Sequence, residues 1–291
     1  MIQRASFAGE LALRVLARGG VAKVTRVFPG AVYARSRDDF VLLLWGSLKS
    51  PMTINLLGGR GASTPFGAED SLVLDKEGLK SSVAEISVSR AVVHRGSLGV
   101  KRALRLPPGR VLAKGVSMLR SMYDVSVSGP LLADDASFRL FLKEVLIPYS
   151  KKRKSGLFRF GSYDRLIGRG TGFTPAGDDF VSGLSATFNF VARSRGSERI
   201  NLPKRLLLQR TVPESGAMVA YSALGYVDEG MERLILASLG MAEEFHDELL
   251  SVASRGHTSG VDMALGVLLC EAALADRERR DGTMETCIAT L

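Results

Sequence analysis

The sequence predicts an α+β protein, with a β-rich N-terminal domain at residues 1–130 and a mainly α-helical domain at residues 131–291. Between residues 20 and 100, β-branched and aromatic residues alternate with polar ones in short runs separated by turn residues, which is typical of strands. From Gly109 onward, apolar residues instead recur at the spacing of one helix face. Because strands and helices occupy different parts of the chain, alternating βαβ units are not expected.

The expected elements start with an amphipathic helix over residues 1–20, because Glu10, Arg14 and Arg18 recur among its apolar residues. These charges also interrupt the apolar core that a secretory signal needs, so a cytoplasmic location is expected. Short strands follow up to residue 100. Apolar stripes then predict helices near Val111 and Phe138 and three longer helices at residues 175–194, 230–253 and 259–278.

Composition narrows the functional class. Of the 291 residues, 46% are hydrophobic and 24% charged, which indicates a globular protein, and the absence of eighteen consecutive uncharged apolar residues argues against a membrane protein. Two cysteines are too few for a disulfide framework or a cysteine-rich zinc site, so buried thiols are expected. The net charge of +9 points to anionic partners, which include nucleic acids and small phosphorylated or carboxylated substrates.

The densest basic run is "KKRK" at residues 151–154, followed by "FRF" at residues 158–160. Cations interleaved with aromatic residues occur in nucleic-acid grooves, but a short run of this kind is also typical of a solvated linker. We favour the linker, and we do not expect nucleic acid to be the partner.

A glycine-rich stretch precedes one of the long predicted helices. It reads "GRGTGFTPAGDDF" at residues 168–180, where Thr174-Pro175 predicts a helix start capped by the threonine. Asp178 and Asp179 then fall in the first turn, where carboxylates complement the helix dipole. Glycines at every second position let bare backbone approach a ligand and leave amides free near a helix N-terminus, so we expect a small-anion site here.

A second stretch repeats this arrangement. In "GHTSGVDMALG" at residues 256–266, Thr258 precedes Asp262 by four residues, the same spacing as Thr174 to Asp178. Two such helix starts could hold one anion from both sides. Thr211 and Ser215, in "RTVPESG", offer two further hydroxyls.

These motifs supply the candidate site residues. The candidate catalytic residues are Asp178, Asp179 and His257, of which the histidine can donate to an anion or exchange a proton near neutral pH, and the two aspartates could also hold Mg²⁺, which prefers oxygen ligands. The candidate substrate-binding residues are Gly168, Gly170, Gly172, Thr174, Gly177, Thr211, Ser215, Gly256, Thr258, Ser259, Gly260 and Asp262.

The motif "GRGTGFTPAGDDFVSGL" is similar to the Gly-x-Gly-x-Gly-Leu-Thr-Pro-Ser-Gly-Asp-Asp signature of the AllH-like family, and "GHTSGVD" resembles its second signature. That family, long catalogued as a domain of unknown function, includes a subunit of the oxamate carbamoyltransferase of allantoin degradation. The resemblance implies carbamoyl transfer between carbamoyl phosphate and a small amide or carboxylate acceptor. The glycine amides and hydroxyls would then hold the phosphate or carboxylate, the aspartates would bind Mg²⁺ or orient the acceptor amide, and His257 would polarise the carbonyl.

Two alternatives stay open. The chain could be a non-catalytic substrate-binding or scaffolding subunit that needs companion subunits. The segment "PAGDDFVSG" also resembles the Gly-Ala-Gly-Asp signature of ribokinase-like small-molecule kinases, although that signature lies late in a large α/β domain, whereas over a third of this chain follows Asp178.

Overall fold

The α+β class is confirmed, because the described strands lie between residues 2 and 94 and every described helix except Glu10–Arg18 follows them. The computed structural model describes residues 2–57, 64–99, 104–126, 135–240, 244–256 and 258–291. Contacts divide the chain into two compact units, Met1–Ser97 with Tyr226–Glu229, and Leu98–Gly225 with Gly230–Leu291. Among the described residues, no helix combines the length and apolarity required to cross a membrane.

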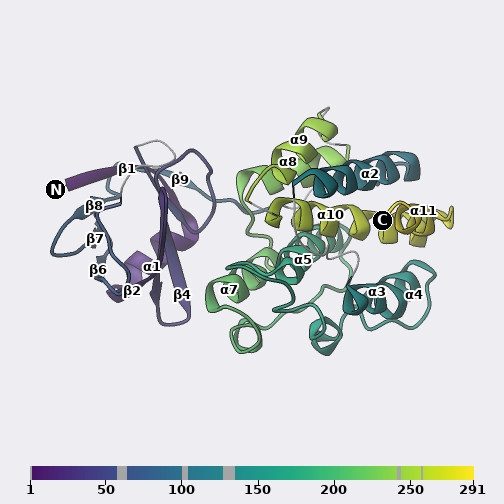
Figure 1. Cartoon of the computed structure of the whole chain (residues 1–291), viewed down its shortest axis with the longest axis horizontal. Coiled ribbons are helices and arrows are strands. Elements are labelled where there is room, and N and C mark those ends of the chain that lie inside the picture. Colours follow the sequence, from purple (N-terminus) through teal and green to yellow (C-terminus); the bar gives the residue numbers. More distant parts are fainter. Residues whose placement is uncertain (1, 58–63, 100–103, 127–134, 241–243, 257) are drawn as a thin grey trace. The chain divides into compact units, whose positions relative to one another are not determined.

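The first unit is a closed sheet with one helix (Figure 1). Its strand order is β5-β4-β3-β2-β6-β7-β8-β1, and β1 pairs back to β5, while β9 pairs with the end of β1. The elements are β1 (Ile2–Gly9), α1 (Glu10–Arg18), β2 (Gly20–Phe28), β3 (Ala31–Ser36), β4 (Asp39–Leu44), β5 (Thr53–Leu56), β6 (Ser71–Asp75), β7 (Gly78–Lys80), β8 (Glu85–Ser87) and β9 (Val92–His94). Alternate strand residues such as Val24, Leu43 and Leu72 form its core together with Leu16 of α1.

The expectation of strands between residues 20 and 100 is confirmed, but the expected helix over residues 1–20 is half wrong. Ile2–Gly9 forms β1, and only Glu10–Arg18 is helical. Strand β1 hydrogen-bonds to β5, β8 and β9. These pairings close the sheet, so tertiary contacts override the helical pattern of this segment.

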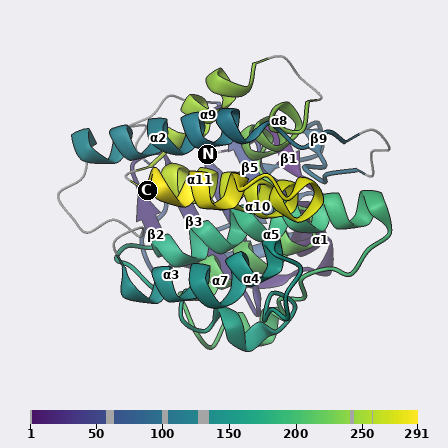
Figure 2. The same cartoon turned by 90° about the vertical axis from the view of Figure 1, so that its right-hand side faces the viewer.

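The second unit contains the remaining helices. They are α2 (Gly109–Ser126), α3 (Ala136–Phe141), a π-helical turn (Leu142–Leu146), α4 (Ile147–Ser150), a 3-10 turn (Phe160–Tyr163), α5 (Ala176–Arg195), α6 (Lys204–Leu207), α7 (Pro213–Ala223), α8 (Glu229–Ser238), α9 (Phe245–Ala253), α10 (Ser259–Arg279) and α11 (Thr283–Ala289). Helix α10 lies between α5 and the pair α2 and α9, and α7 covers the other side of α5 (Figures 1 and 2). Helix α2 packs against α10 and so belongs to this second compact unit; the domain ranges 1–130 and 131–291 stay a prediction.

The predicted helices at 175–194 and 259–278 correspond to α5 and α10. The predicted helix at 230–253 is instead two helices, α8 and α9. Gly240 follows α8 with φ of 74°, a left-handed conformation that ends a helix. Cys270 and Cys287 are buried free thiols, as expected.

Helices α5 and α10 form the centre of the second unit and touch through their backbones. A Cβ atom at Gly183 would lie 2.0 Å from the Met263 carbonyl oxygen, and one at Gly266 would lie 2.2 Å from the Phe180 carbonyl oxygen. The two contacts are reciprocal, because each glycine faces the carbonyl three residues before the other. The crossing therefore admits only glycine at both positions.

This crossing predicts a large loss of stability on adding one methyl group. Gly183→Ala or Gly266→Ala should lower the free energy of unfolding by at least about 1–3 kcal/mol, because a Cβ atom overpacks against backbone that cannot rotate away. Thermal unfolding measures the change. Gly161→Ala is the matched control, because nothing lies within 4 Å of its Cβ position, and unfolding of the Gly183 and Gly266 variants at the control's temperature would contradict the crossing.

Candidate functional site

The starts of α5 and α10 lie side by side. The hydroxyl oxygens of Thr174 and Ser259 are 2.8 Å apart and hydrogen-bonded, although 85 residues separate them in the sequence. The predicted convergence of the two motifs is therefore present in the structure. Thr174 is not the helix cap that the sequence predicted: Pro175 occupies that position, and the threonine hydroxyl reaches across to α10 instead.

The sequence spacing matched Asp178 of the first motif with Asp262 of the second, but in the structure the equivalent positions are shifted by one residue. Counted from each helix start, Gly177, Asp179 and Gly183 of α5 correspond to Gly260, Asp262 and Gly266 of α10. Asp179, and not Asp178, is thus the counterpart of Asp262. The pattern Gly-x-Asp-x-x-x-Gly occurs once in each helix, and the reciprocal contacts of the last glycines bring the two copies together.

The glycine-rich loop bends tightly ahead of α5. Gly168, Gly170 and Gly172 have φ values of 77°, 106° and 103°, a region that favours glycine over every other residue. Gly170 lies against the helix start, since a Cβ atom there would be 2.9 Å from the Ala176 nitrogen. Gly170 and Gly172 are exposed, and no hydrogen bond from their amides occurs within the described part of the chain.

Two predicted ligand-binding glycines pack against protein instead. A Cβ atom at Gly177 would lie 1.9 Å from the Leu166 carbonyl oxygen, and one at Gly260 would lie 2.0 Å from that of Val252. Gly256 has φ of 60° in the turn before α10. Gly177 and Gly260 allow the first turns of α5 and α10 to pack against neighbouring backbone, and Gly256 forms the turn that precedes α10.

Asp178 holds the loop together. Its Oδ1 accepts a hydrogen bond from the Gly168 amide at 2.7 Å, and its Oδ2 accepts from Thr211 Oγ1 at 2.5 Å and from Ser215 Oγ at 2.6 Å. Burial raises the pKa of this carboxyl group, and the three donors partly oppose that shift. Thr211 and Ser215 thus lie beside the glycine-rich loop, as the sequence suggested. Their hydroxyl groups donate to Asp178 and are therefore not free for a ligand. Its oxygens are engaged, so the side chain positions the loop.

Asp179 and Asp262 form a buried pair of carboxyl groups. Asp179 is 6% exposed and Asp262 is fully buried, and the Oδ2 atom of each has no hydrogen-bond partner in the described structure. Burial raises the pKa of Asp262 to about 7, with hydrogen bonds from Tyr123 and Thr258 opposing it. Burial also raises the pKa of Asp179 well above its usual value, and the nearby charge of Asp262 raises it further, while Ser259 and Thr174 lower it.

Tyr123 is a member of this site that sequence analysis missed. Its hydroxyl donates to Asp262 Oδ1 from helix α2. In the sequence it is one aromatic residue beside an apolar stripe, with no glycine or acid pattern around it. Only the packing of α2 on α10 brings it to Asp262.

The magnesium site suggested at Asp178 and Asp179 stays a prediction. Among the described residues, no group of three or more histidine, cysteine, aspartate or glutamate side chains could hold a metal ion, although Mg²⁺ is often bound by only one or two carboxylates. Both oxygens of Asp178 already accept hydrogen bonds from protein donors. His257, the third predicted catalytic residue, lies outside the described residues.

One comparison with known proteins gives a match. Residues 166–271 match the family model described as oxamate carbamoyltransferase subunit AllH. This range contains the glycine-rich loop, both helix starts and the three donors to Asp178. The predicted resemblance to the AllH-like family is confirmed over these residues. Neither the curated proteins nor the solved structures include a significant match to the chain.

The raised pKa of Asp262 predicts a pH-dependent stability. In the unfolded chain this group titrates near its ordinary value of about 3.9, and in the folded chain near 7. Between these values the folded state binds the proton that the unfolded state has lost, so its contribution to stability falls as pH rises from about 4 to about 7. Asp262→Asn should therefore gain stability relative to the wild type across this window, as chemical denaturation at a series of pH values would measure.

The exposed Asp164 provides the control. Asp164→Asn should follow the wild type across the same window, because that side chain is at the surface. Parallel stability curves for Asp262→Asn and the wild type between pH 4 and 7 would contradict the raised pKa.

Proposed function

We propose, from the match of residues 166–271 to the family described as oxamate carbamoyltransferase subunit AllH, that the paired helix starts bind a small carboxamide acid such as oxamate for carbamoyl transfer. The chain is in this proposal a carbamoyltransferase-related subunit. The observation that carries the proposal is the buried pair Asp179 and Asp262 with its two unpartnered oxygens.

An unpartnered buried carboxylate oxygen is costly unless a donor reaches it. A phosphate or carboxylate group brings only acceptors when ionised, whereas a primary carboxamide brings N–H donors. Asp179 retains slight exposure and Asp262 none, so Asp179 is the member that faces the substrate. A carboxyl group that carries a proton can also donate to the amide carbonyl while accepting from its N–H.

The other end of the substrate is an anion. The exposed amides of Gly170 and Gly172 lie in the loop against the start of α5, where the helix dipole favours negative charge. The site thus offers acceptors for the amide end of oxamate and donors for its carboxylate end. The protein's net charge of +9 attracts the same anion from solution.

In carbamoyl transfer, the amide nitrogen attacks the carbonyl carbon of carbamoyl phosphate. A new N–C bond forms, the C–O bond to phosphate breaks, and inorganic phosphate leaves with the bonding electron pair. The nitrogen loses one proton, which passes to an ionised carboxylate of the Asp179–Asp262 pair. A group with a pKa near the working pH suits this proton transfer; burial raises the pKa of both carboxyl groups, that of Asp262 to about 7. The role of His257 in polarising the carbonyl stays a prediction.

A second candidate is a substrate-binding subunit whose chemistry is completed by companion chains. The matched family is described as a subunit, which favours this candidate. The ribokinase-like alternative has less support, since the described strands precede every described helix except α1 and form no repeated strand-helix units around a parallel sheet.

The N–H contact can be tested with two ligands that differ at one group. Pyruvate carries a methyl group where oxamate carries its NH₂ group, so the wild type should bind oxamate at least about tenfold more tightly, because pyruvate leaves the Asp179 oxygen without a donor. In Asp179→Asn this preference should disappear, because the Asn oxygen keeps the hydrogen bonds from Ser259 and Thr174 and its NH₂ group, a donor, takes the place of Oδ2. Isothermal titration calorimetry measures both affinities.

Asp164→Asn is again the matched control and should keep the preference for oxamate. Equal affinities of the wild type for oxamate and pyruvate, or an unchanged preference in Asp179→Asn, would contradict the proposed contact. A turnover assay with carbamoyl phosphate then separates the candidates: oxamate binding with turnover supports the enzyme, and binding without turnover supports the subunit that needs companions.

A further inference from the structure

A cleft of about 720 Å³ lies at the far ends of the two central helices. It is lined by Phe188 and Arg195 from the second half of α5, and by Leu274 and Arg277 from the end of α10. Phe188 follows Asp179 by nine residues, which is about 14 Å along a helix. The cleft is therefore separate from, and independent of, the proposed carboxamide site.

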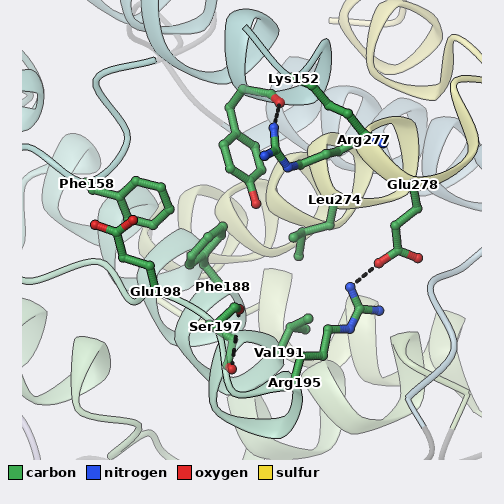
Figure 3. Close-up of a pocket in the computed structure, with 12 residues that line it drawn as sticks. Lys152, Phe158, Phe188, Val191, Arg195, Ser197, Glu198, Leu274, Arg277 and Glu278 are labelled. Carbon is green, nitrogen blue, oxygen red and sulfur yellow. Dashed lines mark hydrogen bonds and ion pairs between the residues drawn. The ribbon is translucent and has the colours of Figure 1, made fainter. Parts of the chain in front are cut away.

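Three aromatic rings form one wall of the cleft. Tyr149, Phe158 and Phe188 pack edge to face, with centroid distances of 5.5 to 6.3 Å. Tyr149 and Phe188 are buried, whereas Phe158 is only half-buried. Phe158 thus leaves part of its ring to a ligand, and Leu274 continues the apolar floor (Figure 3).

Charged side chains surround this wall. Arg195 is paired with Glu278. Arg277 donates to the Tyr149 carbonyl oxygen at 2.8 Å and stacks over that ring at 4.4 Å, but no ion pair is recorded for it in the described part of the chain. The same holds for Lys152 and Glu198, which line the cleft too. Lys152 and Arg277 lie on one side, and Phe158 and Glu198 on the other (Figure 3).

This arrangement offers cations on one side and a carboxylate beside an exposed ring face on the other. We propose that the cleft binds a mononucleotide whose base carries N–H donors. The phosphate contacts Lys152 and Arg277, the base stacks on Phe158, and Glu198 accepts from the base N–H groups. A cleft of this volume matches the size of small-molecule sites.

The same residues explain the basic run that the proposed function leaves unused. "KKRK" supplies Lys152, and the following "FRF" supplies Phe158. The adjacent Lys151 is engaged elsewhere, since it pairs with Glu285 at 2.6 Å. A single lysine and a single ring that reach one cleft suit one nucleotide rather than a strand of nucleic acid.

Titration of the full chain with GMP tests the proposal, with guanosine, inorganic phosphate and a short single-stranded oligonucleotide as comparisons. GMP should bind saturably, and guanosine and phosphate each at least about tenfold more weakly, because each loses one half of the contacts. Inosine monophosphate, which lacks the exocyclic amino group, should bind more weakly than GMP in the wild type but equally in Glu198→Ala, which has no side-chain acceptor.

The segment itself provides matched controls. Lys152→Ser and Phe158→Leu should each weaken GMP binding by about tenfold, while Lys154→Ser and Phe160→Leu, which change the same residue types outside the cleft, should not. Unchanged melting temperatures show that the variants remain folded. No GMP binding by the wild type at millimolar concentration, equal effects of the control variants, or tighter and steeply salt-dependent binding of the oligonucleotide would overturn the proposal.

Discussion

The backbone contact between α5 and α10 at Gly183 and Gly266 is the constraint on which the helical unit depends. Each glycine presses on a carbonyl oxygen of the opposite helix, so the crossing point and the register are both fixed. The two helices run in the same direction, because their starts also touch through Thr174 and Ser259. The starts and the far ends of α5 and α10 take their relative positions from this crossing.

Two helices that start side by side place two positive dipole ends together, which is unfavourable without negative charge. Asp179 and Asp262 occupy equivalent positions in the first turns and lie where that charge is needed. Burial opposes their ionisation and raises the pKa of both groups. The outcome is a pair of carboxyl groups with raised pKa values and unpartnered oxygens beside a glycine loop with free amides. A substrate with N–H donors at one end and an anion at the other complements both features.

The sequence was informative wherever backbone geometry demands a particular residue. Glycine spacing, the Thr-Pro dipeptide and the paired acids predicted two converging helix starts, and the segregation of periodic patterns predicted the α+β class. The sequence was less informative wherever contacts between distant segments determine the local structure or the partner of a side chain. Residues 2–9 form a strand because they close a sheet. The sequence spacing matched Asp262 with Asp178, whereas in the structure its counterpart is Asp179. Tyr123 has no local sequence pattern that marks it as part of the site. The charge and aromatic pattern at residues 151–160 showed which residue types were present but not the cleft that uses them.

A crystal structure of the full chain with oxamate bound tests the central claim most directly. The account places oxamate at the starts of α5 and α10, with its nitrogen within hydrogen-bond distance of Asp179 and its carboxylate on the amides of Gly170 and Gly172. Oxamate bound elsewhere on the helical unit, or bound at these helix starts with its carboxylate toward Asp179 and its nitrogen toward the glycine loop, would contradict it.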